Sequence, residues 1–185
     1  ETGAVVNKIL TELTLEELQR YHLLTSKEQV PLFEDVLKLV DGKVPLIVEL
    51  KVVNSSTDTN GLCSKADLLL QKYHGLYCVE SFHPACVNWY HKNRPEIIRG
   101  QLAERPKAQA KGKMCIAMTI MQYLLTNFIT RPNFIAYNHH NRHNLSRMLC
   151  HRLFKNPAIA WTIRSKQELE DNRKYFDYFI FEHFI

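Results

Sequence analysis

Short apolar runs alternate with longer amphipathic stretches along most of the chain. Six runs, rich in β-branched and aromatic residues, are too short for helices and predict strands at 45–52, 77–82, 96–102, 134–137, 158–163 and 176–181. Helical patterns lie between them at 66–73, 84–92, 114–128, 144–154 and 166–174. Strands that alternate with helices predict right-handed crossovers and a parallel α/β sheet.

Two helices are expected ahead of the first strand. Thr14-Leu-Glu-Glu17 is a capping box, in which the Thr hydroxyl and the Glu carboxylate bind free N–H groups at a helix start. Pro31 opens a second helix, which is expected to end near Gly42. No linker divides the chain, so residues 1–185 are predicted to form a single domain.

The strand at 45–52 carries charge where a covered strand should be apolar. Leu46, Val48, Leu50 and Val52 share one face, because side chains alternate along a strand, and Glu49 and Lys51 share the other. Opposite charges on a buried inner face cost several kcal/mol unless they pair or bind an ion. Parallel α/β folds place their chemistry at the C-terminal strand ends. The spacing leaves two interpretations open, a structural salt bridge and a functional site.

Composition narrows the class of partner. Of 185 residues, 45% are hydrophobic and 23% charged, which excludes a disordered chain. The net charge of +5 fits an anionic small molecule or an anionic membrane surface, and it is too weak to indicate nucleic acid. The five cysteines have no C-x-x-C spacing, which favours reduced thiols. No signal peptide is recognised at Glu1, so a cytoplasmic or membrane-associated location is expected.

Six segments, in order, resemble the glycerophosphodiester phosphodiesterase family. They cover the helix before its third strand, its E-x-K strand, its S-F-x-P turn, its fifth-strand pattern, its W-T-V strand and its closing strand. The matching residues are Val30–Leu37, Pro45–Lys51, Glu80–Pro84, Arg94-Pro95 with Arg99–Leu102, Ala160–Ile163 and Phe176–Glu182. Glu80 stands where the family usually has Ser, and Glu182 where it has Asp, which leaves the subfamily open.

The resemblance implies a TIM-type (β/α)₈ barrel truncated to six strand–helix units, strands 3 to 8. Such barrels typically have about 250 residues, so two units of about 30 residues are missing. The family's H-R-G, P-E-N-T and H-D motifs, which supply both catalytic His, two carboxylate ligands and an Arg, are not found in this sequence. No catalytic residue can therefore be assigned here.

The resemblance also implies roles for particular residues. Glu49 would be the third carboxylate ligand of Mg²⁺ or Ca²⁺, and Lys51 would reach the substrate phosphate. Trp161, Phe82 and Gln101 would line the pocket, with core packing as the alternative. The implied reaction is hydrolysis of a glycerophosphodiester to glycerol 3-phosphate and an alcohol. The 185-residue chain itself is expected to be inactive, and the alternative function is a non-catalytic phosphate-binding or interaction module.

Three further features remain open. His139, His140 and His143 favour a polar loop over a substrate contact or a zinc site. The basic stretch 105–113 fits a solvated loop, and the helix at 114–129 fits a helix packed on the domain. The alternative is that these two segments together dock on anionic lipid. The two bare sheet edges that truncation leaves are expected to be covered by residues before Pro31, by a second copy in a homo-oligomer, or by aggregation.

Overall fold

The computed structural model describes residues 12–23, 26–53, 56–104 and 126–184. Its packing divides the chain into two compact units, residues 1–44 and 45–185. The basic stretch 105–113 and most of the helix expected at 114–129 lie outside the described residues. No helix in the described ranges is long and apolar enough to span a membrane. The expectation of one domain over 1–185 stays a prediction.

The first unit contains both helices that the sequence predicts. Helix α1, Leu15–Leu18, has the complete capping box: Thr14 Oγ1 accepts from Glu17 N–H at 3.3 Å, and Glu17 Oε2 accepts from Thr14 N–H at 2.9 Å. Helix α2, Phe33–Val40, begins two residues after Pro31. It ends where the backbone turns left-handed at Asp41 and Gly42, with φ of 48° and 71°.

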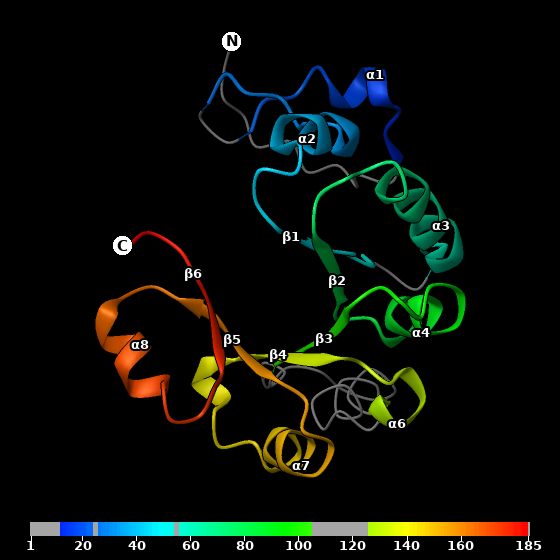
Figure 1. Cartoon of the computed structure of the whole chain (residues 1–185). Helices are drawn as coiled ribbons and strands as arrows, with labels where there is room; N and C mark the ends of the chain where they lie inside the picture. Colours follow the sequence, from blue (N-terminus) through cyan, green and yellow to red (C-terminus); the bar gives the residue numbers. More distant parts are fainter. Residues whose placement is uncertain (1–11, 24–25, 54–55, 105–125, 185) are drawn as a thin grey trace. The chain divides into compact units, whose positions relative to one another are not determined.

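The second unit contains one parallel sheet, which curves as Figure 1 shows. Its strand order follows the chain order, β1-β2-β3-β4-β5-β6, within the described residues. The strands are β1 Leu46–Glu49, β2 Tyr77–Ser81, β3 Arg99–Ala103, β4 Phe134–Asn138, β5 Ala158–Ile163 and β6 Tyr178–Phe181. The six predicted strands and their parallel direction are confirmed. A closed barrel of eight strands is not what these residues form.

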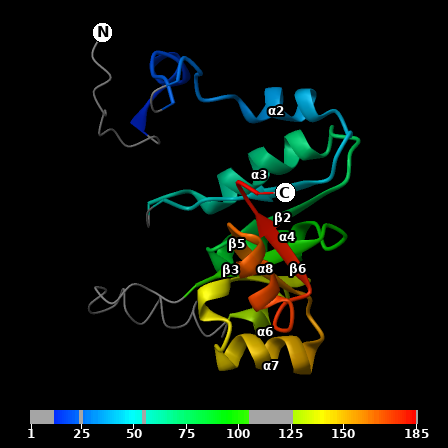
Figure 2. The same ribbon diagram turned by 90° about the vertical axis from the view of Figure 1, so that its left-hand side faces the viewer.

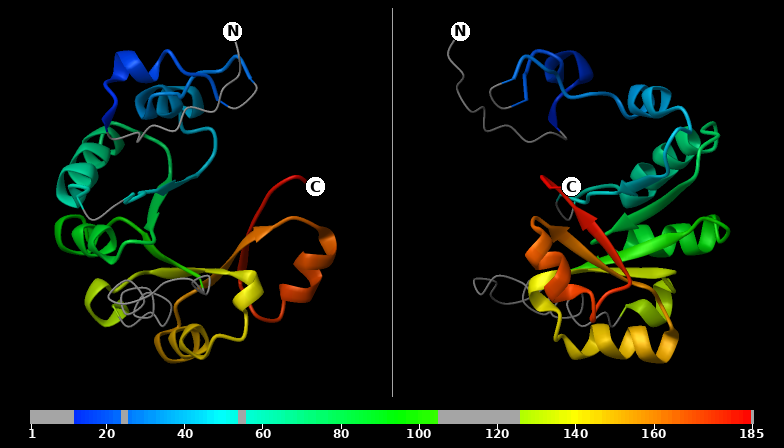
Figure 3. Two further views of the ribbon diagram at one scale, coloured as in Figure 1. Left: turned by 180° about the vertical axis from the view of Figure 1, so that it is seen from behind. Right: turned by 60° about the vertical axis from the view of Figure 1, so that its left-hand side comes forward.

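Helices lie on the outer, convex side of this sheet, as Figures 1 and 3 show. They are α3 Thr59–Leu70, α4 Pro84–Asn93, α6 Asn127–Thr130, α7 Leu145–Phe154 and α8 Lys166–Asn172, with a short 3₁₀ helix, η2, at His139–Asn141. Figure 2 shows the strands of the sheet from the side. Helices α4, α7 and α8 confirm the sequence predictions for their segments, whereas α3 overlaps the predicted helix at 66–73 only in part, because it begins at Thr59 and ends at Leu70.

Two apolar layers fill the two faces of the sheet. On the helix side, Ile135, Tyr137 and Ala158 pack with Cys150 of α7 and with Phe176. On the inner side, a second cluster is built on Leu102, Phe134 and Ala136. Gly100 lies next to it: a Cβ at this position would come within 2.1 Å of the Phe134 ring. The absence of a side chain at Gly100 therefore lets the inner layer close.

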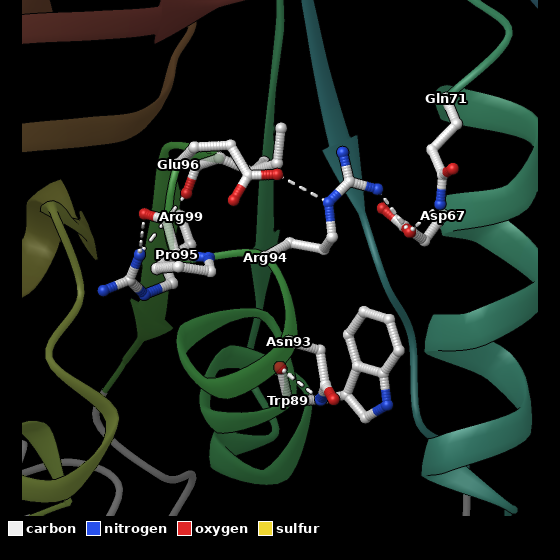
Figure 4. Close-up of polar contacts among 9 residues, drawn as sticks. Asp67, Gln71, Trp89, Asn93, Arg94, Pro95, Glu96 and Arg99 are labelled. Atoms are coloured by element: carbon white, nitrogen blue, oxygen red, sulfur yellow. Dashed lines mark hydrogen bonds and ion pairs between the residues drawn. The ribbon is translucent and has the colours of Figure 1, made fainter.

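The N-terminal ends of the strands are held by arginines. Arg94 Nη1 donates to Asp67 Oδ2 of α3 at 2.5 Å and its Nε to Glu96 Oε1 at 2.6 Å, so that it lies between two carboxylates (Figure 4). Arg99, buried at the start of β3, donates to the carbonyls of Pro95 and Arg131 at 3.3 and 2.8 Å. These two family-like positions therefore stabilise the end of the sheet opposite to its carboxyl end.

The sequence-based expectation of a strand covered on both faces is wrong for β1. Among the described residues β1 pairs only with β2, so it is an edge strand, and Ile47 on its inner face is 50% exposed. Strand β6 is the other edge, and Tyr178 and Phe181 are exposed there. The charges at 49 and 51 therefore lie beside solvent, and they are tolerated at a lower cost than in a buried strand.

Candidate carboxylate site at the strand ends

Two carboxylates lie side by side at the carboxyl end of the sheet. The parallel register pairs Glu49, the last residue of β1, with Glu80 of β2. Paired residues of neighbouring strands point to the same face, and the strands run about 4.8 Å apart. Both carboxylates therefore project from the inner face, on the side away from the helices. The backbone continues the pairing, because Leu50 N–H donates to the Glu80 carbonyl at 2.8 Å.

Glu80 is the buried member of this pair. It is 7% exposed, and its Oε2 has no hydrogen-bond partner in the described part of the chain. Burial, and secondly the charge of Glu49, raise the pKa of Glu80 to about 7. Cys78 lies two residues earlier on the same face. Its pKa is raised to about 11, mainly by burial and secondly by the charge of Glu80.

Glu49 and Lys51 form an ion pair outside the core. Lys51 Nζ lies 3.4 Å from Glu49 Oε2, and the two side chains are 74% and 30% exposed. The sequence predicted a strand over 45–52 with Lys51 inside it. This is wrong for Lys51, because β1 ends at Glu49 and Lys51 follows the strand. An ion pair this exposed contributes about 0–1 kcal/mol. Lys51 is therefore held loosely and can exchange its partner for an anionic ligand.

Phe82 and Trp161 form an aromatic wall above the inner cluster. Their rings meet edge to face, with centroids 5.5 Å apart and planes at 90°. Both pack against the cluster of Leu102, Phe134 and Ala136. The Nε1–H of Trp161 is buried and finds no acceptor among the residues that the structure describes. The sequence named these two residues from strands far apart in the chain, and the fold brings them into contact.

Gln101 lies elsewhere than the sequence suggested. Its register neighbours are Ser81 and Ile135, and Ile135 belongs to the helix-side core. Its buried amide Nε2 donates to the carbonyls of Ser81 and Phe82, both at 3.0 Å. It therefore holds the backbone where β2 ends, and it does not line the inner face.

The histidine cluster is partly structural. His139 is buried and its ring lies against that of His140, with centroids 3.9 Å apart and planes tilted by 38°. Its Nε2 lies 3.9 Å from Glu168 Oε2, and burial is the main reason why the pKa of His139 is lowered. His143 contacts the Tyr175 ring. Across residues 12–23, 26–53, 56–104 and 126–184, no three His, Cys, Asp or Glu side chains gather closely enough to hold a metal ion by themselves.

Two positions that depart from the family pattern behave differently. Glu182, just after β6, accepts from Arg164 Nε at 2.6 Å, and both side chains are more than 40% exposed. Glu80 lacks any such cation among the described residues. Sequence reasoning recorded Glu80 only as a departure from Ser and gave it no role. The sequence feature that could have identified it is its position: Glu80 is the single carboxylate within the apolar run 77–82.

The fold is shared with solved glycerophosphodiester phosphodiesterases. One from Parabacteroides distasonis matches with a TM-score of 0.69 at 13% identity, over 91% of this chain and 66% of that one. Another, from Thermotoga maritima, matches with a TM-score of 0.59 at 15% identity, over 91% of this chain and 65% of that one. The chain thus spans less than two thirds of the length of these proteins. The resemblance predicted from the motif order is confirmed at the level of the fold.

No protein-family model matches the sequence, and no curated protein matches it.

Proposed function

We propose that this chain carries the cation-binding and phosphate-binding side of a phosphodiesterase site, for the metal-dependent hydrolysis of glycerophosphodiesters to glycerol 3-phosphate and an alcohol. The observation that carries the proposal is the carboxylate of Glu49 at the carboxyl end of the sheet, with the ammonium of Lys51 3.4 Å away. The fold supports it, because parallel α/β barrels place their chemistry at this end.

The residues present fit a hard divalent cation, Mg²⁺ or Ca²⁺. Such ions prefer carboxylate oxygen, and a Mg²⁺ site often uses only one or two protein carboxylates, completed by water and by phosphate oxygens. The buried, unpartnered Oε2 of Glu80 next to Glu49 matches that preference. Glu49 is the ligand that the sequence named. When bound, the cation supplies positive charge beside the phosphate oxygens.

Each remaining residue has a role in holding the substrate. The ammonium of Lys51, 74% exposed and loosely paired, can move to a non-bridging phosphate oxygen and neutralise charge that grows there during the reaction. Phe82 and Trp161, which meet edge to face, offer an apolar wall to the glycerol carbons. No described residue is assigned the proton transfers.

A second candidate function is phosphodiester binding without turnover. It is the alternative that the sequence analysis left open, and a measurement of turnover decides between the two. Docking on anionic membrane and pairing of two copies through the sheet edges remain predictions from the sequence, as does the cellular location.

The test of the proposed function combines binding with turnover. The chain is titrated with glycerophosphocholine in the presence of Mg²⁺ or Ca²⁺, and release of glycerol 3-phosphate is followed in a coupled assay. Lys51→Met is expected to weaken binding about tenfold, since one charge-assisted contact is lost. Lys72→Met, at an exposed lysine after α3, is the control. Equal binding by both variants contradicts the phosphate role of Lys51, and binding without turnover supports the second candidate.

A further inference from the structure

Glu80 is a buried acid that the fold alone does not explain. Asp67, the other buried carboxylate in the described residues, is neutralised by Arg94 at 2.5 Å and receives Gln71 Nε2 at 2.6 Å. Each acid has one oxygen without a hydrogen-bond partner among the described residues, Asp67 Oδ1 and Glu80 Oε2, but Glu80 also has no ion-pair partner there. A buried carboxylate without a counter-charge is costly. The cost calls for a partner that is not one of the described side chains.

The position of Glu80 identifies the chemistry of that partner. Its register neighbour is Glu49, whose own cation, Lys51, extends mostly into solvent. The nearest charge to Glu80 is therefore negative, and an anionic partner is excluded. A divalent cation bound between two carboxylate oxygens on adjacent strands satisfies both acids at once.

We propose that Glu80 is a second carboxylate ligand, which binds a divalent cation together with Glu49 at the carboxyl ends of β1 and β2. This inference rests on the proposed function, since it adds a ligand to the same cation site. It assigns Glu80 a direct role that the family resemblance did not give it.

Charge complementarity supports the arrangement. With both acids ionised, Glu49, Glu80 and Lys51 carry a net charge of about −1, which repels a phosphodiester, itself close to −1 at neutral pH. A divalent cation reverses this net charge to about +1. The same two carboxylates that attract the cation therefore make phosphodiester binding depend on it.

The test is direct titration with the metal alone. Ca²⁺ and, in separate experiments, Mg²⁺ are titrated into the chain at pH 8 by isothermal calorimetry, for the wild type and for Glu49→Gln, Glu80→Gln and Glu182→Gln. Glu80→Gln is expected to weaken binding by at least about 10-fold, since the loss of a group that only supports a metal ligand already costs about 10- to 100-fold. Glu182→Gln removes a carboxylate at the same end of the sheet that already has Arg164 as its partner, so its affinity should stay within about twofold.

The outcomes separate this inference from the proposed function. Weakened binding in both Glu49→Gln and Glu80→Gln upholds the inference. Weakened binding in Glu49→Gln alone overturns it and leaves the metal assignment of Glu49 standing. No saturable binding by the wild type, or unchanged binding by Glu49→Gln, overturns the proposed metal site itself.

A second measurement on the wild type does not depend on any variant folding. The side-chain carboxyl ¹³C signal of a glutamate moves when its carboxylate binds a diamagnetic cation. In a chain with ¹³C-labelled glutamate, the carboxyl signals of Glu49 and Glu80 should both shift as Ca²⁺ saturates the site. A shift of the Glu49 signal with an unmoved Glu80 signal contradicts the shared site.

Discussion

Replacing Glu80 by Gln should stabilise the protein, and the gain should depend on pH. The side chain is 7% exposed and its pKa is raised from 4.5 to about 7, chiefly by burial. At about 1.4 kcal/mol per pKa unit, this difference corresponds to about 3 kcal/mol of unfolding free energy that ionisation removes. The amide of Gln has nearly the same shape and never ionises, so the variant should escape this loss.

The sign follows from proton uptake. The unfolded chain releases the Glu80 proton near pH 4.5 and the folded chain near pH 7, so between these values the folded state binds more protons. Stability contributed by the protonated acid is therefore present below pH 4.5, falls as pH rises through that window, and is lost above about pH 7. Wild type and Glu80→Gln should differ little at pH 4.5 and by about 3 kcal/mol at pH 8.

Urea unfolding in EDTA at pH 4.5, 5.5, 6.5 and 8 measures this difference. The Glu80→Gln midpoint should exceed that of the wild type increasingly with pH, while the denaturant slope m stays unchanged. Glu182→Gln, at an exposed acid paired with Arg164, should show no such pH-dependent gain. A constant difference across the series, or a variant less stable than the wild type at pH 8, refutes the reasoning about the burial of Glu80.

Three further predictions test other parts of the structure. In a thermal melt at pH 8, Ca²⁺ at about 100 times its Kd should raise the unfolding free energy of the wild type by about 2.7 kcal/mol. The same Ca²⁺ concentration should raise the unfolding free energy of Glu80→Gln much less. An equal increase in both proteins contradicts shared ligation. Asp67→Asn should lower the unfolding free energy by about 3 kcal/mol in urea, because Arg94 then keeps only one carboxylate partner; a loss below about 1 kcal/mol refutes this. Gly100→Ala should destabilise by about 1–3 kcal/mol, since its Cβ meets the Phe134 ring, and Phe134→Leu in the same chain should recover part of the loss; no recovery contradicts that contact.

The strands were predictable from the sequence because each apolar run is short and bounded by turn-forming or polar residues. Their order and direction followed from the intervening helices. The end of a strand was less predictable, since a side chain can take part in the pairing there: the Leu50 carbonyl accepts a hydrogen bond from Ser81 Oγ at 2.6 Å. Apolar alternation continues through Leu50 and Val52, yet β1 ends at Glu49, which places Lys51 outside the sheet.

The faces of the inner strands were not readable from the sequence. All five residues of β3 are buried, so Gln101 gave no alternation from which its side could be inferred. Only the register with Ser81 and Ile135 places it on the helix side. Likewise, the contact between Phe82 and Trp161 needs the curvature that brings β2 and β5 close, which no local pattern encodes.

Glu80 is the position where sequence and fold disagree most. A buried strand selects apolar residues, and a buried acid elsewhere in this chain, Asp67, is matched by an arginine and an amide. Glu80 is neither apolar nor matched by a cation among the described residues, and the neighbouring charge of Glu49 further disfavours its ionised form. Local rules of this kind are broken chiefly where a ligand compensates for the cost. The same carboxylate that weakens the cation-free fold is therefore the best single marker of the proposed cation site.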